Sequence, residues 1–377
     1  CMIKYRNTNN CFTLFRKKEK STLYTSMMSR KMILPILAGL LVPWVVNMYH
    51  FLGFSTQLVY NDENCVLANP TGLIGSEDLA IGRPRGSRGN ENGKEDTILF
   101  ITQGDLKNVF HNNGQAAEGH IWTMRVDAME PQIAPVVGFP ETTLFQPHGC
   151  YVSNTNDLLY VINHVGTYSA VEVFSIQYHR RRTDDDRNRP PATLTYVHSI
   201  RDDDHFPVHG INDVVEGASR GEIYVTIWLP FGIFVSADIT MFLQSVLAFV
   251  FRVRLTRVLR CTWGVSSSSS SSQCQDATDH RQHRFFMANG ITTNDDRSRI
   301  FVNDVLDKKI VVFSRSNEGS GSLVFDSDIV LPFAGDNVEY DSETGALHIG
   351  SIPLLHSPKE GGMMVAITKE EEELSRN

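Results

Sequence analysis

The sequence predicts an all-β protein. Beyond Phe54, short apolar runs that alternate in polarity recur at a spacing of roughly ten residues, and turn residues separate them. Stretches with the 3.6-residue period of a helix are nearly absent, which argues against an α/β fold. These two observations allow a sandwich, a barrel or a propeller. The expected strands are Thr97–Thr102, His120–Val126, Cys150–Val152, Leu158–Asn163, Ala170–Gln177, Leu194–Ile200, Gly221–Thr226, Arg299–Val302, Ile310–Ser314 and Ala346–Ile349.

A repeated unit favours the propeller among these three. Segments 153–163, 293–304 and 340–350 each contain a turn rich in Asn, Asp or Ser that leads into an apolar strand. Repetition of one hairpin-like unit is typical of propeller blades, which stack around a common axis.

Composition limits the partners of the chain. It has 377 residues, of which 41% are hydrophobic, so it can bury a core of ordinary size. The formal net charge is −8, and no extended basic patch balances the acids. Because nucleic-acid binding depends on Lys and Arg contacts to phosphate, no nucleic-acid partner is expected.

The N-terminal part has the pattern of a targeting segment. Residues 1–31 are polar and basic, and Met32–Phe54 contains no charged residue. A run of this length can span the roughly 30 Å of a bilayer. The basic flank fits a signal peptide or a signal anchor, and the poor cleavage signature favours the anchor. We therefore expect a propeller domain at 65–377 that is membrane-anchored or secreted and faces the secretory lumen or the outside.

Three stretches interrupt the strand pattern, at 83–96, 180–191 and 231–284. The first two are polar or charged and read as solvated insertions. The third begins with the apolar run Phe231–Phe251, and four arginines follow it by residue 260. An interfacial amphipathic helix, a second membrane span and a helix that covers the β-core all fit this pattern. Membrane contact through 231–260 is thus one of the open interpretations.

Four cysteines lie beyond the expected anchor, and none forms a Cys-x-x-Cys motif, which argues against a thiolate zinc site. An oxidising compartment would permit a disulfide. Cys261 and Cys274 are the closest pair, across a loop.

The stretch Phe145–His164 resembles a hairpin with a histidine at each open end. Paired strands keep their ends together, so His148 and His164 are expected at the same rim of one sheet. Two imidazoles in contact suit proton transfer near neutral pH. The alternative is two unrelated loop histidines.

Four short motifs share one form, an acid or amide pair between small or apolar residues. Asn and Asp side chains supply oxygen atoms of the kind that Ca²⁺ prefers, without excess negative charge. In a propeller, one such motif from each of several blades can converge on the central channel. The motifs are Gly75-Ser76-Glu77-Asp78, Ile211-Asn212-Asp213-Val214, Ala288-Asn289-Gly290-Ile291 and Gly335-Asp336-Asn337-Val338.

Together, these motifs make the chain resemble the paraoxonase/arylesterase family. The similar runs occur in the order of the family and cover roughly residues 65–352. They are IGSEDLAI (74–81), QPHG (146–149), LLYVINH (158–164), SAVEVFSIQ (169–177), INDVV (211–215), FMANGITTNDDRSRIFVNDVLDKKIVVF (286–313) and DNVEYDSETGALHIG (336–350). The resemblance implies a six-bladed β-propeller behind a hydrophobic N-terminal anchor. It also implies a calcium-dependent hydrolase that opens lactones and cleaves aryl esters.

The resemblance further implies two calcium ions and a histidine dyad. His148 would act as the base, and His164 would pass the proton on toward solvent. The catalytic ion would be held by Glu77, Asn212, Asn289, Asp336 and Asn337. The structural ion would be held by Asp78, Asp213 and the backbone carbonyl of Cys150.

The chain departs from the family pattern in three places. The apolar stretch Thr226–Phe231, which includes Trp228, stands where the family has a polar Asn-Asp-His stretch, and Ser351-Ile352 replaces a Cys-His pair. The remaining segment, Pro353–Asn377, is shorter than the closing segment of the family, so an incomplete last blade and an unpaired Cys65 are expected. These departures sustain an alternative, a non-catalytic or strictosidine-synthase-like propeller that calcium stabilises and that serves as a binding scaffold.

Overall fold

The computed structural model describes residues 76–85, 97–105, 118–128, 130–165, 168–179, 189–207, 210–229, 253–264, 273–278, 283–316, 321–352 and 363–367. The chain divides into two compact units, Cys1–Leu52 and Gly53–Asn377, and every described residue belongs to the second. All regular elements in these ranges are strands.

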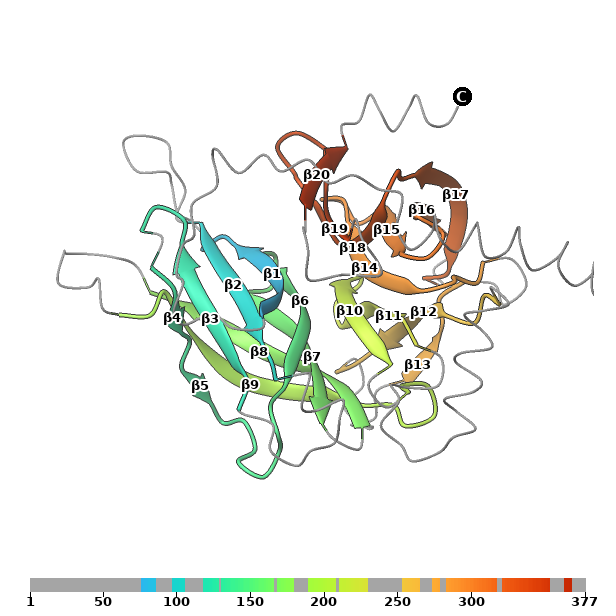
Figure 1. Ribbon diagram of the computed structural model, residues 1–377. Coiled ribbons are helices and arrows are strands. Elements are labelled where there is room, and N and C mark those ends of the chain that lie inside the picture. Colours follow the sequence, from blue (N-terminus) through green and yellow to red (C-terminus); the bar gives the residue numbers. More distant parts are fainter. Residues whose placement is uncertain are drawn as a thin grey trace, which may run out of the picture. The chain divides into compact units, whose positions relative to one another are not determined.

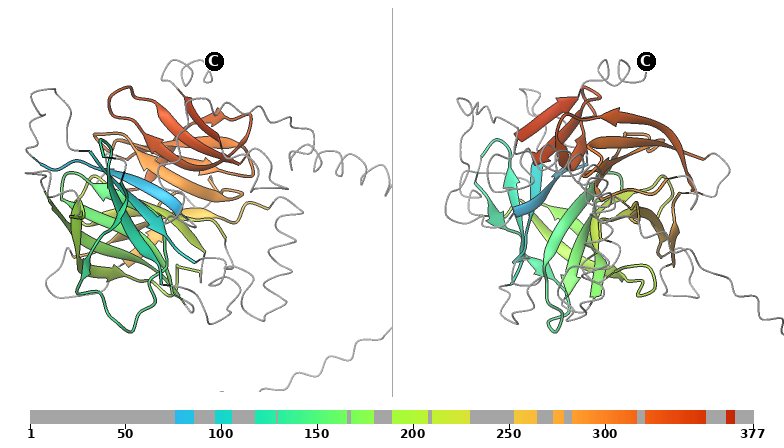
Figure 2. Two further views of the ribbon diagram at one scale, coloured as in Figure 1. Left: turned by 60° about the vertical axis from the view of Figure 1, so that its left-hand side comes forward. Right: turned by 45° about the vertical axis from the view of Figure 1, so that its right-hand side comes forward.

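The described strands form five separate sheets, which we number in chain order (Figures 1 and 2). Sheet 1 contains β1 (Ser76–Gly82), β2 (Ile98–Gln103), β3 (His120–Arg125) and β4 (Gln132–Ile133). Sheet 2 contains β6 (Pro147–Ser153), β7 (Leu158–Val165), β8 (Tyr168–Tyr178), β9 (Ala192–Ile200) and β5 (Val136–Val137). Sheet 3 contains β10 (Ile211–Glu216), β11 (Glu222–Ile227), β12 (Arg257–Thr262) and β13 (Gln273–Asp276).

Sheets 4 and 5 complete the described part of the fold. Sheet 4 contains β14 (Ala288–Thr293), β15 (Arg299–Asp304), β16 (Lys309–Arg315) and β17 (Leu323–Val330). Sheet 5 contains β18 (Ala334–Tyr340), β19 (Leu347–Ile352) and β20 (Met363–Ile367). Successive strands pair antiparallel in each sheet, apart from β5, which pairs parallel with β9.

The five sheets are arranged as the blades of a propeller. Each inner strand contacts the inner strand of the next sheet, in the order β1, β6, β10, β14 and β18. This is the arrangement expected around a central axis. The prediction of a β-propeller is therefore confirmed, but the expected six blades are not: the described ranges hold five sheets.

Hydrophobic cores fill the spaces between consecutive sheets. Phe100 of sheet 1 packs in one cluster with Phe174 of sheet 2, and Tyr160 of sheet 2 packs in the next with Ile223 of sheet 3. Two further clusters join sheet 3 to sheet 4 and sheet 4 to sheet 5. Strands buried on both faces lose the alternation of polarity that marks a half-exposed strand, and every residue of β10 and β14 is buried.

Every strand expected from the sequence occurs, with shifts of a few residues at its ends. Four of the five inner strands, β1, β10, β14 and β18, did not stand out as strands and coincide with the four polar motifs. The strands β12 and β13 come from within the stretch 231–284 and form the outer half of sheet 3.

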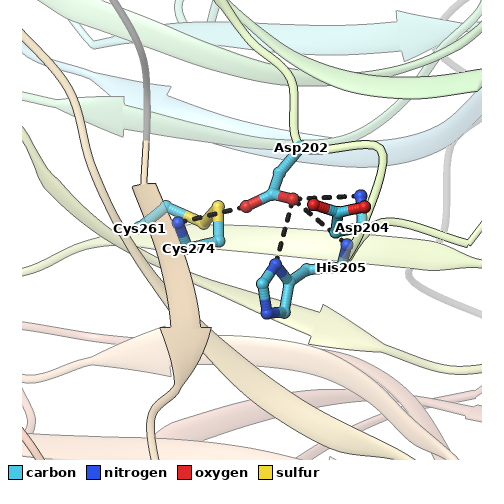
Figure 3. The surroundings of a disulfide bond; sticks show 5 residues. All are labelled: Asp202, Asp204, His205, Cys261 and Cys274. Atoms are coloured by element: carbon cyan, nitrogen blue, oxygen red, sulfur yellow. Dashed lines mark hydrogen bonds and ion pairs between the residues drawn. A yellow bond between two sulfur atoms is a disulfide. The ribbon is translucent and has the colours of Figure 1, made fainter. Parts of the chain in front are cut away.

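The predicted disulfide is confirmed. Cys261 and Cys274 lie directly opposite one another on β12 and β13, with their sulfur atoms 2.05 Å apart. Next to it, Asp202 accepts a hydrogen bond from the backbone N–H of Cys274 and contacts His205 Nδ1 at 3.0 Å (Figure 3). The disulfide thus joins the two outer strands of sheet 3 covalently, beside the loop that follows sheet 2.

No helix within the described ranges is long and apolar enough to cross a membrane. The expected anchor Met32–Phe54, the apolar run Phe231–Phe251 and Cys65 lie outside the described residues.

Candidate active site

Each of the five inner strands carries an irregularity of register at the same relative position. In every case two residues of the inner strand intervene between regular pairs with the second strand of the sheet. Such bulges redirect side chains away from the regular alternation of a strand and are common next to active sites. The intervening pairs are Glu77-Asp78 on β1, His148-Gly149 on β6, Asn212-Asp213 on β10, Asn289-Gly290 on β14 and Asp336-Asn337 on β18.

Glycine in two of these bulges allows neighbouring inner strands to approach closely. A Cβ atom on Gly149 would lie 2.3 Å from the carbonyl oxygen of Asn212, and one on Gly290 would lie 2.6 Å from Cα of Asn337. Both distances are shorter than van der Waals contact, so no side chain fits. The glycines therefore bring the polar residues of consecutive blades together.

Two bulge aspartates bind the next blade in the same way. Oδ2 of Asp78 accepts a hydrogen bond from the backbone N–H of Cys150 at 2.8 Å. Oδ2 of Asp213 accepts one from the backbone N–H of Ile291 at 2.9 Å. Cys150 and Ile291 each directly follow a bulge glycine. The repetition places both carboxylates, which are 9% and 4% exposed, at the same level of the propeller.

Buried carboxyl groups are concentrated at this level. Burial and the nearby Asp78 raise the pKa of Asp213 well above its ordinary value. Burial and then Asp78 also raise the pKa of Glu339, on β18, to about 8. Burial raises the pKa of the Cys150 thiol too, and the charges of Asp78, Asp213 and Glu339 add to this effect. A bound cation would relieve this mutual repulsion.

The amide side chains in the bulges add neutral oxygen atoms. Asn212 and Asn289 are buried, and Oδ1 of Asn289 has no hydrogen-bond partner in the described structure. A buried carbonyl oxygen without a partner is costly, and a metal ion is one way to satisfy it. The pKa of Asp336 is raised by burial, against a hydrogen bond from the Asn289 side chain. These donors, carboxylate and amide oxygens, fit a hard divalent cation such as Ca²⁺.

Most of the residues expected to hold calcium lie at or next to the bulges, and their role as ligands stays a prediction. Asp78, Asn212, Asp213, Asn289, Asp336 and Asn337 all lie in the bulges, and Cys150 follows one. Glu77 lies on β1, but its side chain is outside the described part. Among described residues, no group of three or more His, Cys, Asp or Glu side chains has the geometry of a metal site.

The two histidines predicted to share a rim do contact one another. Nδ1 of His148 lies 3.0 Å from Nε2 of His164. Nδ1 of His164 lies 3.1 Å from Oγ of Ser169. Because burial lowers the pKa of His148 to about 4, this imidazole is neutral near pH 7 and can accept a proton.

Both side chains behind His148 in this series of hydrogen bonds are buried. His164 has no exposed surface, and its partner Ser169 is 1% exposed. The hydrogen bonds run from His148 on β6 through His164 on β7 to Ser169 on β8, all within sheet 2. Proton transfer from His164 toward solvent stays a prediction.

A buried amide holds the segment that carries His148. Oδ1 of Asn163 accepts a hydrogen bond from the backbone N–H of Gln146, and its Nδ2 donates to Leu144 O and to Glu172 Oε1. The backbone N–H of His164 donates to the carbonyl of Gln146. These bonds fix the start of β6 against β7, which positions His148.

Comparison with known proteins identifies the family. The family model described as Arylesterase matches residues 111–360, which is more than half of the chain. The chain belongs to the arylesterase family.

Two curated relatives agree with this assignment. Serum paraoxonase/lactonase 3 of Homo sapiens is 25% identical over 296 residues, which cover 77% of this chain and 70% of the relative. Serum paraoxonase/arylesterase 2 of Gallus gallus is 25% identical over 278 residues, covering 71% and 68%. Among solved structures, a gluconolactonase from Xanthomonas campestris matches with a TM-score of 0.39 and 10% identity, over 72% of this chain and 68% of that one. This last similarity is too low to add to the assignment.

The arylesterase-family pattern is altered beside the histidine pair. Trp228 follows the end of β11, where a polar stretch was expected, and its ring lies edge-on to His148 with the centroids 6.3 Å apart. Its backbone N–H donates to the carbonyl of Gly210 at 2.9 Å, which fixes the start of this segment. Ser351, at the other altered position, is buried on β19 opposite Gly335.

The pattern search missed two residues of this site. Glu339 directly follows the motif of β18 and was not singled out, although its alternation with Asn337 could have indicated the same face. Ser169 opens the run SAVEVFSIQ (169–177), which resembles the family but carries no chemical motif of its own. Its pairing with His164 follows from the antiparallel register of β7 and β8, and no spacing in the sequence marks it as a contact.

Proposed function

We propose that this member of the arylesterase family is a calcium-dependent hydrolase that opens lactones and cleaves aryl esters. The observation that carries the proposal is the contact between His148 and His164, whose ring nitrogens lie 3.0 Å apart. His148 belongs to the bulge of β6, and the bulges of the other inner strands carry Asp and Asn oxygens. A neutral base beside a set of oxygen ligands is the combination that metal-assisted ester hydrolysis requires.

The ligands that we propose follow from the family pattern and the bulges. Glu77, Asn212, Asn289, Asp336 and Asn337 would hold a catalytic ion. Asp78, Asp213 and the carbonyl of Cys150 would hold a structural one. When bound, a hard cation supplies polarisation of the substrate carbonyl and stabilises the negative charge that develops on its oxygen.

The residues of the chain supply the proton transfers. His148 accepts a proton from water as the water oxygen forms a bond to the carbonyl carbon, and the carbonyl π electrons move to oxygen. When the tetrahedral intermediate collapses, the ester C–O bond breaks, and His148 returns the proton to the leaving oxygen. The products are an acid and an alcohol, joined in one hydroxy acid when the substrate is a lactone.

Hydrolysis of phenyl acetate and of a panel of aliphatic lactones, with Ca²⁺ and with excess EDTA, tests the proposal. We expect turnover that chelation abolishes and that added Ca²⁺ restores. Asp213→Asn should weaken Ca²⁺ binding by about tenfold or more, whereas Asp296→Asn, in the turn between β14 and β15, should not. Hydrolysis that survives complete chelation would contradict the calcium dependence.

The same experiment separates the alternative function. The indole of Trp228 next to His148, in place of polar groups, favours a propeller that keeps calcium for stability and serves as a binding scaffold. In that case Ca²⁺ would raise the melting temperature, no substrate of the panel would be hydrolysed, and His148→Gln would change nothing measurable.

We also propose that the domain faces the secretory lumen or the outside, anchored or secreted through Met32–Phe54. The Cys261–Cys274 disulfide supports this, because disulfides persist in oxidising compartments. Protease protection in sealed microsomes that express the full chain tests it. Digestion of the propeller without detergent would contradict a luminal location.

A further inference from the structure

Ser169 occupies a defined place behind the histidine pair. It lies on β8 directly opposite His164 on β7, and it is 1% exposed. Its Oγ lies 3.1 Å from Nδ1 of His164, whose Nε2 lies 3.0 Å from Nδ1 of His148. The three side chains therefore form one continuous series of hydrogen bonds. His148, at one end of it, is a bulge residue of β6, and Ser169 is at the other end.

A neutral imidazole carries a single N–H, which restricts how this series can be arranged. In one arrangement, Ser169 donates to His164 Nδ1 and His164 Nε2–H donates to His148 Nδ1, so that His148 carries its proton on Nε2. In the other, His148 Nδ1–H donates to His164 Nε2, and His164 Nδ1–H donates to Ser169. In the second arrangement, Nδ1 of His148 carries the proton and contacts His164. Nε2 of His148 then has a lone pair that can accept a proton from water. In the first arrangement, Nε2 is already protonated.

We propose that Ser169 is a positioning residue that selects the second arrangement by accepting the N–H of His164 Nδ1. The inference rests on the proposed hydrolysis and deepens it, because it assigns the base to one atom, Nε2 of His148. When that atom accepts a proton from water, His148 becomes a cation whose Nδ1–H still donates to His164. Donation from His164 to Ser169 makes His164 Nε2 a better acceptor, which stabilises this cation.

No proton needs to travel beyond His148 in this scheme. The proton that Nε2 takes from water returns to the leaving oxygen when the C–O bond breaks. The burial of His164 and Ser169 is then consistent with their role, since a group that orients and polarises a base does not require contact with solvent.

The test compares Ser169→Ala and Ser169→Thr with the control Ser175→Ala. Ser175 lies on the same strand, and its Oγ donates to Thr195 O at an exposed position. We expect Ser169→Ala to lower kcat by between about tenfold and a hundredfold with little change in KM, by analogy with the loss of groups that orient metal-ligating histidines. Ser169→Thr, which keeps the hydroxyl, should restore most of kcat, and Ser175→Ala should match the wild type.

A second readout needs no substrate. In protein labelled with ¹⁵N-histidine, the ring nitrogens of His164, assigned with His164→Gln, should show a protonated Nδ1 in the wild type and a mixture of tautomers in Ser169→Ala. An unchanged kcat in Ser169→Ala, or a wild-type spectrum with the proton on Nε2 of His164, would overturn the proposal. If the wild type hydrolyses no substrate, the proposed function fails, and the ¹⁵N spectrum still decides the arrangement of the pair.

Discussion

Asn337 on β18 donates a hydrogen bond from Nδ2 to Oδ1 of Asp78 on β1, at 3.0 Å and across 259 positions of the chain. These strands are the inner strands of the last and the first described sheets. The same carboxylate accepts the backbone N–H of Cys150 through its other oxygen. One buried side chain therefore joins the inner strands of sheets 1, 2 and 5. The polar centre is part of what holds the propeller together.

Gly149→Ala should destabilise the fold, because its methyl group would overlap the backbone of Asn212 and Asp213 on the next blade. Overpacking of this kind costs about 1–3 kcal/mol of unfolding free energy. Gly350→Ala is the matched control, since the nearest atom to its Cβ would be 3.8 Å away. Urea unfolding measures both. Equal midpoints for the two variants would show that the inner strands can separate at little cost.

Glu339→Gln should change how stability depends on pH when calcium is removed. The pKa of Glu339 is raised to about 8 in the fold, against about 4.3 in an unfolded chain. Between these values the folded state binds more protons, so the wild type loses stability as pH rises from about 4 to 8. The variant lacks this loss. Melting temperatures in EDTA across this range should diverge with pH, and parallel curves would contradict the shift.

The pH profile of hydrolysis should reflect the burial of His148. Its pKa is lowered to about 4, so the neutral base persists in mildly acidic solution, and the acidic limb of kcat/KM should lie near pH 4. His148→Gln should lower kcat by about 10²–10⁴-fold. His348→Gln, at a partly exposed site near Asp341, is the control. An acidic limb near pH 6.5, the ordinary value for histidine, would rule out His148 as a desolvated base.

Trp228→Ala should change the ratio of kcat/KM between aryl and aliphatic substrates more than it changes the hydrolysis rate of either class through His148. An aromatic wall beside His148 favours an aryl group, and aromatic contacts of this kind contribute about 0.5–1.5 kcal/mol. The kcat/KM for phenyl acetate should therefore fall by roughly 2- to 10-fold relative to that for a small aliphatic lactone. Trp122→Phe, on β3 of sheet 1, provides the comparison. An unchanged ratio in Trp228→Ala would place the aryl group elsewhere.

Strands such as β2 and β3 could be predicted from the sequence because their alternation of polarity follows from one covered and one less covered face. The outer strands β12, β13 and β17 were not among the expected strands. The inner strands β10 and β14 show no such alternation, because every one of their residues is buried, and each carries a polar pair in its bulge. In β1 and β18 the polar pair falls within the strand, and the bulge interrupts the period of two. In the sequence, the polar pairs thus indicate a site, whereas the strands that carry them are evident only in the structure.

The residue types of the candidate site were determined by the sequence alone. Asp, Asn and His in apolar surroundings indicate buried polar groups, and the glycines beside them permit close strand contacts. The tertiary structure alone decided that five bulges lie at one level, that Glu339 lies near Asp78, and that His164 contacts Ser169. These relationships depend on how the sheets pack around the axis. Residues of different blades meet there through long-range contacts, which local sequence patterns do not encode.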